Sequence, residues 1–351
     1  MPENSPPPLK GRTVTITGLG AHLPPDIVTN DDLSASLETS DEWIAQRTGI
    51  RARRVAAAGL SSSDLGTLAG AAALADAGVP PENVDLVITA TISPDQLMPA
   101  TASRVAHGCG CVNAGAFDLS AGCSGFVYAL AMAAGAIASG VRDHVLVVGA
   151  ETISRVLDWQ DRSTAVLFGD AAGAALVSAA TGAGGILGFD LGGDGSGADF
   201  LAIPAGGSRL PASHDTVDAR QHFMVMNGQE VYKFATRIVS QSAGKVLRRC
   251  GREVGDIDLF VPHQANLRII EGAVKKLGMA EEKVYTNLQK YGNTSCASIP
   301  LCLTEARAEG RLNEGDLVLL MGFGAGLTWG ACLMEWGGAA AAHGHSNVGS
   351  E

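Results

Sequence analysis

Short apolar runs alternate with longer alanine-rich or amphipathic stretches along most of the chain. The stretch 61–77 begins with Ser-Ser-Ser-Asp and is followed by Gly78, which predicts a capped helix. Short, mainly apolar runs predict buried strands, and four of them span residues 14–18, 84–90, 145–149 and 174–178. Strands that alternate with helices in this way predict an α/β protein whose strands are covered on both faces.

The stretch 121–141 contains no charged residue, and its length alone would allow it to span a membrane. It is rich in Gly, Ala and Ser, and it lacks the aromatic belt and the N-terminal basic flank that mark membrane helices. We therefore expect a helix buried in the middle of the protein, and no membrane partner.

Features of the first half of the chain recur in the same order in the second half. The similar pairs are residues 83–87 and 256–260, residues 117–125 and 284–298, and residues 168–173 and 323–326. Their offsets of 173, 172 and 155 residues predict a gene duplication. The stretch 181–222 has no counterpart and is expected to form long surface loops. We therefore divide the chain into a tail (1–11), two halves (12–180 and 181–336) and a second tail (337–351).

The net charge and the cysteine content indicate which partners and which cellular compartment to expect. The 25 Lys and Arg against 36 Asp and Glu give a net charge of −11, which disfavours general nucleic-acid binding but allows a local basic patch. Seven scattered cysteines form no disulfide framework, and the Pro-rich N-terminus has no apolar leader segment. These features predict a cytoplasmic protein with reduced thiols.

Cys123 lies in the sequence AGCSG (121–125), between a predicted short strand at 117–120 and an alanine-rich helix. Unpaired backbone N–H groups at a helix start carry positive potential, which favours the thiolate form of a cysteine. The pattern therefore suits a nucleophile. It also suits an inert buried thiol, which is the commonest role of a free cysteine.

Three later segments could complete a site. His263 follows the predicted strand at 259–261, so it would lie at the edge of the sheet where α/β proteins place their sites. Asn293 lies in a turn before a helix, where a helix N-cap or an Asx-turn is the ordinary alternative. The segment GFGAG (322–326) either brings backbone N–H groups close to a bound atom or forms a tight hairpin turn.

Motifs for other chemistry are incomplete. Leu23 occupies the place of the third glycine in a dinucleotide-binding fingerprint, and the chain has no phosphate-binding Walker loop. Cys109 and Cys111 lack the second Cys/His pair that a zinc site needs. His343 and His345 lie in the C-terminal tail, where solvation is the simpler interpretation. We expect no metal and no cofactor.

Cys123, His263, Asn293 and the segment 322–326, in this order, resemble the thiolase superfamily, and more narrowly the β-ketoacyl-acyl carrier protein synthase III family. The other matching motifs are DEWI (41–44), RTGI (47–50), FGD (168–170), VPHQAN (261–266), GNTS (292–295) and TWG (328–330). The resemblance covers residues 12–336 and implies a duplicated, five-layered α/β/α/β/α fold that forms a homodimer. The stretch 181–222 and the C-terminal extension depart from compact members of the family.

The resemblance implies that this enzyme starts type II fatty acid synthesis from an acyl-CoA and malonyl-acyl carrier protein, without a cofactor. Cys123 would take the acyl group as a thioester. His263 and Asn293 would donate hydrogen bonds to the malonyl thioester oxygen while CO₂ leaves. The backbone N–H groups of Cys123 and Ala325 would form the oxyanion hole. The family often has Gly at the position of Ala325.

The resemblance also assigns binding residues. It places Trp43, Arg47 and Arg162 around the adenine of CoA, and Asn266 along the pantetheine tunnel. It places Met98 in the acyl pocket across the dimer interface, where Met is slimmer than the common Phe and predicts primers longer or more branched than acetyl. A basic rim for the acidic acyl carrier protein would consist of Lys233, Arg268, Lys275 and Lys276.

Other functions remain open from the residues alone. The nearest alternative is a starter-unit ketosynthase or an acyltransferase of a polyketide pathway, which would share Cys123 but differ in its acceptor. Chalcone-synthase-type enzymes share the three residues but lack the basic docking face. A cysteine hydrolase conflicts with the duplication, and a non-catalytic scaffold would typically have lost one of the three residues.

Overall fold

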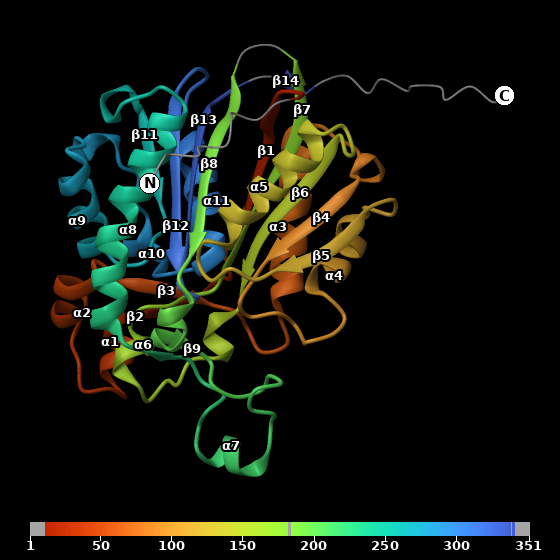
Figure 1. Ribbon diagram of the computed structural model, residues 1–351. Helices are drawn as coiled ribbons and strands as arrows, with labels where there is room; N and C mark the ends of the chain where they lie inside the picture. Colours follow the sequence, from red (N-terminus) through yellow and green to blue (C-terminus); the bar gives the residue numbers. More distant parts are fainter. Residues whose placement is uncertain (1–10, 182–183, 338, 341–351) are drawn as a thin grey trace.

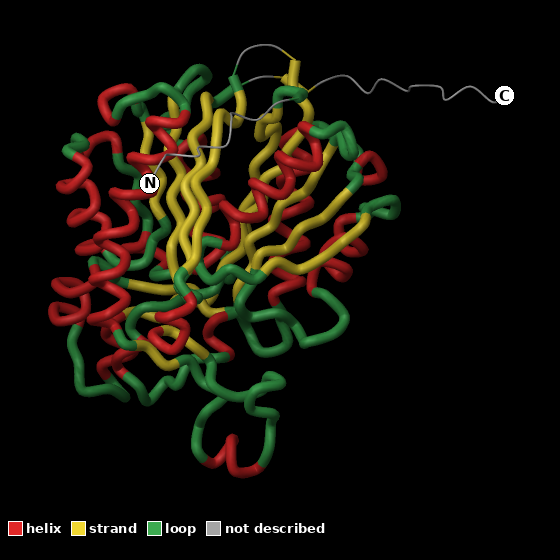
Figure 2. Tube along the Cα trace, in the orientation of Figure 1, coloured by secondary structure: helices red, strands yellow, loops and turns green. Residues whose placement is uncertain are grey.

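The computed structural model describes residues 11–181, 184–337 and 339–340. Two sheets lie side by side, with helices between them and on both outer faces (Figures 1 and 2). This is the five-layered thiolase-like α/β/α/β/α fold that the family resemblance implies. The apolar runs became strands because their side chains are buried on both sides of each sheet.

The first sheet has the strand order β1-β7-β6-β4-β5, and β14 (Ala339–Ala340) pairs with β7. Strand β4 is parallel to both of its neighbours, whereas β7 is antiparallel to β1 and β6. Its strands are β1 (Val14–His22), β4 (Leu86–Ala90), β5 (Gly115–Leu119), β6 (His144–Glu151) and β7 (Ala171–Thr181).

The second sheet repeats this arrangement with four strands in the order β11-β12-β13-β8. Strand β11 is parallel to β12, and β13 is antiparallel to β12 and β8. Its strands are β8 (Gly185–Gly193), β11 (Leu259–Pro262), β12 (Leu317–Gly324) and β13 (Thr328–Glu335).

The helices form three layers. Helices α3 (Ser62–Ala77) and α4 (Thr101–Cys109) cover the outer face of the first sheet, and α8 (Gly228–Arg249) covers that of the second, with α9 (Leu267–Leu277) against α8. Helices α5 (Gly125–Ala138) and α11 (Ser298–Ala308) lie between the sheets and pack on both of them. The expected helix in 121–141 is therefore buried in the protein. Its small side chains allow both sheets to approach closely.

The remaining elements are short. Strands β2 (Asp26–Thr29) and β3 (Ala52–Val55) pair, as do β9 (Leu201–Ala202) and β10 (Val225–Met226). The loop that carries α7 projects from one end of the molecule (Figure 1). The other short helices are α1 (Asn30–Ser34), α2 (Asp41–Thr48), α6 (Arg162–Ala165), α7 (His214–Asp218) and α10 (Leu288–Tyr291). The 3₁₀ helices are η1 (Pro81–Asn83), η2 (Ile153–Arg155), η3 (Gly195–Phe200), η4 (Val254–Asp256), η5 (Glu281–Lys283) and η6 (Ser295–Ala297).

The prediction for 181–222 was partly wrong. Strand β8 lies within this stretch, and it occupies the place in the second sheet that β1 occupies in the first. Its glycines hid its strand character, because the alternation of side chains that marks a strand is interrupted. The boundaries of the two halves, 12–180 and 181–336, stay a prediction, and the two tails fall almost wholly outside the described residues.

The unequal offsets of the repeats also have a structural reason. Strands β4 and β11 begin 173 residues apart, as do β6 and β12, whereas β7 and β13 begin 157 residues apart. The difference arises in the connection between the last two strands of each half. In the first half this connection spans residues 152–170, whereas in the second it is the three-residue turn 325–327.

Candidate active site

Cys123 lies between β5 and α5, two residues before α5 begins, and its side chain is buried. The glycine-rich end of β12 packs directly against it. A Cβ added to Gly324 would lie 2.7 Å from the backbone nitrogen of Cys123 and 3.1 Å from its sulfur. Gly122, with φ of 53°, faces the backbone of Ala325 in the same way. Segment 322–326 lies at the β12–β13 hairpin and brings its backbone close to Cys123, whereas the presentation of its N–H groups to a bound atom stays a prediction.

His263 follows β11 and is fixed on three sides. Its backbone N–H donates to the carbonyl of Met321 at 2.7 Å, and its ring contacts the ring of Phe323 with centroids 5.4 Å apart. Its Nδ1 lies 2.7 Å from the hydroxyl of Ser298. Burial lowers the pKa of His263 to about 3, because the charged form loses its hydration. The imidazole is therefore neutral at physiological pH.

Asn293 is held by its backbone and by its side-chain oxygen. Its N–H donates to the carbonyl of Leu167 at 2.8 Å, and its carbonyl accepts from the N–H of Gly169 at 3.0 Å. Its Oδ1 accepts from the N–H of Ser295 at 2.8 Å. This is the turn-forming role that the sequence offered as an alternative. Because the oxygen is engaged there, the NH₂ group is left to act as a donor.

The three residues line one cavity of about 130 Å³, so the structure brings together the side chains that the sequence selected. A second cavity, of about 140 Å³, meets the first at Cys123, Phe168 and Leu201. The second is lined by apolar side chains and backbone, among them Ile92, Ile203, Met224 and Ala325. The sulfur of Cys123 therefore lies where a channel with polar groups joins an apolar pocket.

The electrostatics differ from the expectation of a thiolate. Burial raises the pKa of the Cys123 thiol to about 12, and the nearby carboxylate of Glu151 acts in the same direction. The sequence suggested a thiolate because the residue precedes a helix, but it could not show that the sulfur is removed from water. In the free protein the group is a thiol.

Glu151 is a buried acidic residue that the sequence analysis missed. It ends β6, and its carboxylate accepts from the hydroxyl of Ser93 at 2.6 Å and from the N–H groups of Ile92 and Ser93 at 3.1 and 3.2 Å. The backbone of Cys296 also approaches it, at 3.4 Å. Glu151 thereby holds the loop whose Ile92 forms a wall of the apolar pocket. A charged residue at the end of an apolar strand was the available signal.

The residues expected at the CoA-binding end also lie together. The guanidinium carbon of Arg47 lies 4.3 Å from the ring centroid of Trp43, and that of Arg162 lies 4.7 Å from it. Asn266 caps α9, donates to the carbonyl of Arg47 at 3.1 Å and lines the cavity of Cys123. Asn266 thus connects the group around Trp43, through the backbone of Arg47, with the cavity that Cys123 lines.

The four residues of the expected basic rim are exposed and lie on α8 and α9, which pack together. Lys233 pairs with Glu230 at 2.7 Å, and Lys276 donates to the carbonyl of Thr236 at 3.1 Å. Arg268 donates to the carbonyl of Gln46 at 3.1 Å, while Lys275 lies in the last turn of α9. Met98 is 85% exposed on the loop after β4 and lines neither cavity of its own chain.

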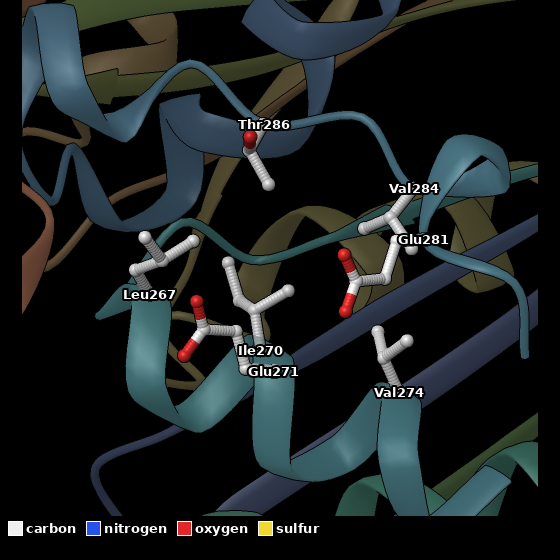
Figure 3. Close-up of a pocket in the computed structure, with 7 residues that line it drawn as sticks. All are labelled: Leu267, Ile270, Glu271, Val274, Glu281, Val284 and Thr286. Atoms are coloured by element: carbon white, nitrogen blue, oxygen red, sulfur yellow. The ribbon is translucent and has the colours of Figure 1, made fainter. Parts of the chain in front are cut away.

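A third cavity lies between α9 and the following segment (Figure 3). The carboxylates of Glu271 and Glu281 lie beside apolar side chains there, but none of the three selected residues lines it. Among the described residues, no group of three His, Cys, Asp or Glu side chains could hold a metal ion. Nor does any helix in the described ranges have the length and hydropathy needed to cross a membrane.

A duplicated five-layered fold whose Cys, His and Asn line one cavity, with the Cys also lining an apolar pocket, defines a condensing acyltransferase of the thiolase type. Comparisons with known proteins narrow this class. Residues 117–195 match the family model "3-Oxoacyl-[acyl-carrier-protein (ACP)] synthase III", and residues 247–336 match the model of its C-terminal part. The chain belongs to the β-ketoacyl-[acyl-carrier-protein] synthase III family, and it is an enzyme.

Individual relatives support this assignment along nearly the whole chain. A β-ketoacyl-[acyl-carrier-protein] synthase III from Symbiobacterium thermophilum is 54% identical over 94% of this chain and 100% of its own length. The crystal structure of a synthase III from Thermus thermophilus is 48% identical, with a TM-score of 0.87 over 93% of this chain and 100% of that one. A priming β-ketosynthase from the R1128 polyketide pathway is 38% identical, with a TM-score of 0.86 over 95% of this chain and 99% of that one.

Proposed function

We propose that this enzyme condenses an acyl-CoA primer with malonyl-acyl carrier protein, with Cys123 as the nucleophile and His263 and Asn293 as donors to the malonyl thioester. The observation that carries the proposal is the single cavity that these three side chains share, with Cys123 at its junction with an apolar pocket. The product is a 3-oxoacyl-acyl carrier protein, the first intermediate of type II fatty acid synthesis.

In the first step, Cys123 attacks the thioester of the acyl-CoA. A bond forms between Sγ and the acyl carbon, the bond from that carbon to the CoA sulfur breaks, and the thiol proton ends on CoA. The backbone N–H groups of Cys123 and Ala325 stabilise the tetrahedral oxyanion. Ala325 serves in place of glycine because the donor is its backbone. The acyl chain then occupies the apolar pocket beside Ile92 and Met224.

In the second step, the malonyl group on the carrier arm loses CO₂. Negative charge develops on the thioester oxygen, where the NH₂ group of Asn293 and Nε2–H of His263 stabilise it. The enolate carbon attacks the acyl carbon, the bond to Cys123 breaks, and the thiolate takes a proton from solvent. A neutral imidazole suits this step, because its N–H can donate while the ring carries no charge.

The residues that bind the two substrates are part of the same proposal. Trp43, Arg47 and Arg162 hold the adenine of CoA, and Arg162 must move aside, because its present 4.7 Å separation from the ring leaves no space for a stacked base. Asn266 lines the pantetheine channel. Lys233, Arg268, Lys275 and Lys276 receive the acidic carrier protein.

The homodimer belongs to this proposal as well. Strand β5 is an edge of the first sheet, and its Phe117 is 40% exposed. Leu97 and Met98, on the preceding loop, are also exposed large apolar side chains. An exposed edge and neighbouring apolar side chains suit pairing with a second copy, in which Met98 reaches the partner's acyl pocket. The cytoplasmic location expected from the free thiols and the absence of a cofactor are further parts of the proposal.

The test is direct. The protein is incubated with radiolabelled acetyl-, isobutyryl- and octanoyl-CoA, and the labelled peptide is identified by mass spectrometry. We expect label on the peptide that contains Cys123, none in the variant C123A, and full labelling in C302A, which removes another buried thiol. Label on a different peptide would refute the assignment of the nucleophile, and strict preference for acetyl-CoA would refute the wider pocket.

The polyketide alternative differs in pathway rather than in chemistry. The relatives that are 43–54% identical are all named as synthase III enzymes, so fatty acid synthesis is favoured. Assays with the carrier proteins of both kinds of pathway from the same organism would separate the two.

A further inference from the structure

Ser298 is a fully buried residue at the start of α11 that faces the imidazole of His263. Its hydroxyl oxygen lies 2.7 Å from Nδ1 of His263 and 2.8 Å from the carbonyl oxygen of Ser295. A serine hydroxyl has one proton, so it can donate to only one of these two groups. The choice between them has a chemical consequence for the other nitrogen of the ring.

Because burial keeps the imidazole neutral, one ring nitrogen carries a proton and the other does not. If Ser298 donates to the Ser295 carbonyl, Nδ1 must be the protonated nitrogen, and Nε2 is left as a bare acceptor. If Ser298 donates to Nδ1, the proton of the ring is on Nε2. Only the second state gives the cavity a hydrogen-bond donor.

The second state, in which Ser298 donates to Nδ1, has little free-energy cost elsewhere in the protein. When the hydroxyl turns away from the Ser295 carbonyl, that carbonyl keeps the backbone N–H of Ser298 as a partner. Within the described part of the chain, the Ser298 hydroxyl is the only hydrogen-bond partner of Nδ1. A buried ring nitrogen without a hydrogen-bond partner is unfavourable. Removal of the Ser298 hydroxyl therefore removes the hydrogen bond that orients the imidazole ring.

We propose that Ser298 is a positioning residue that selects the Nε2–H tautomer of His263 by donating its hydroxyl proton to Nδ1. This inference rests on the proposed function, because only the decarboxylation step needs a donor on Nε2. Acylation of Cys123 does not use that proton. Loss of Ser298 therefore affects the two half-reactions unequally, whereas a general loss of structure affects both.

The kinetic test compares S298A with the wild-type enzyme in each half-reaction. We expect decarboxylative condensation to fall at least tenfold in kcat, as for loss of an oxyanion donor, while acylation of Cys123 by labelled acyl-CoA changes less than about twofold. S298T, which keeps a hydroxyl, restores most of the activity. S242A is the matched control, since it removes another fully buried serine hydroxyl, bonded to Asp190 at 2.7 Å outside both cavities.

A spectroscopic test reads the tautomer itself. In ¹⁵N-histidine-labelled protein, the signals of His263 are assigned by their absence in the variant H263Q. We expect a protonated Nε2 and an unprotonated Nδ1 in the wild-type enzyme, and loss of this preference in S298A. A protonated Nδ1 in the wild-type enzyme, or equal losses in both half-reactions of S298A, would overturn the inference. If wild-type Cys123 takes no acyl group, the proposed function itself fails, which is a different result.

Discussion

At the scale of single residues, burial away from water has the largest effect on the pKa values of the site. The pKa of His263 is about 3 in the folded protein, against an ordinary value of 6.5. As the pH falls, this residue is therefore protonated in the unfolded chain before it is protonated in the folded protein. This contribution to the free energy of unfolding is fully present above pH 6.5 and is lost as the pH falls toward 3. The slope of this loss is up to about 1.4 kcal/mol per pH unit.

The variant H263Q removes this titration. Urea unfolding between pH 7 and pH 4 should show the free energy of unfolding of the wild-type protein falling more steeply than that of H263Q. Parallel curves for the two proteins would show that the imidazole is not held neutral by its surroundings.

The close approach of β12 to Cys123 predicts a second residue-scale effect. In G324A, the added Cβ would lie 2.7 Å from the Cys123 nitrogen and displace the thiol. We expect a loss in kcat on the order of 100-fold, because small misplacements of reacting groups have effects of this size. The matched control is G135A in α5, where a Cβ meets nothing within 4 Å. It should keep activity and raise the free energy of unfolding by about 0.5–1 kcal/mol.

Sequence alone selected Cys123, His263 and Asn293, which the structure brings together in one cavity, because each lies in a short motif next to a strand or helix end. It could not identify Ser298 or Glu151, whose roles depend on contacts with residues distant in the chain. It also predicted a thiolate, whereas burial raises the pKa of the Cys123 thiol. The helix start is a local feature that a sequence displays, whereas the removal of water requires both sheets to be in place.

At the scale of elements, β6 is joined to the loop after β4 by Glu151. In E151Q one side-chain oxygen becomes an NH₂ group, so at least one of the N–H groups that donate to the carboxylate, those of Ile92, Ser93 and Cys296, would face another donor. We expect the free energy of unfolding to fall by about 1–3 kcal/mol, measured by urea titration. Acylation by the longer primers should be impaired most, because Ile92 lines the apolar pocket in which we propose that the acyl chain binds. Unchanged stability would show that the carboxylate is not needed to hold this loop.

The basic residues on helices α8 and α9 lead to a prediction that concerns only the second substrate, malonyl-acyl carrier protein. In K275E and K276E, the KM for malonyl-acyl carrier protein should rise about tenfold and depend less on salt, because carrier docking is electrostatic. Acylation by acyl-CoA serves as the internal control and should stay unchanged. A variant that impairs both substrates equally would exclude a specific docking face.

The strands β1, β4, β5, β6, β7 and β11 and the helix α3 could be predicted from apolar runs and capping, and α5 was correctly expected to be buried. Strand β8 was not found, because glycines interrupt its pattern and its partner β13 lies more than a hundred residues later. Strand β8 occupies the place in the second sheet that β1 occupies in the first, which explains the strand order of the second half.

At the scale of the whole molecule, the edge strand β5 predicts self-association. The double variant L97K/F117K places charges on exposed apolar positions, so it should shift a dimer to a monomer in analytical ultracentrifugation. If Met98 completes the partner's pocket, the monomer should also lose primer selectivity. A wild-type protein that sediments as a monomer would contradict this prediction.

The junction of the two cavities at one sulfur also has a kinetic consequence. Cys123, His263 and Asn293 line a single cavity, and in the proposed function both substrates bring a phosphopantetheine arm through it to Cys123. Released CoA must therefore depart before the carrier protein can deliver its malonyl group, which dictates a ping-pong sequence. An excess of either donor should then slow turnover by occupying the channel at the wrong stage of the cycle.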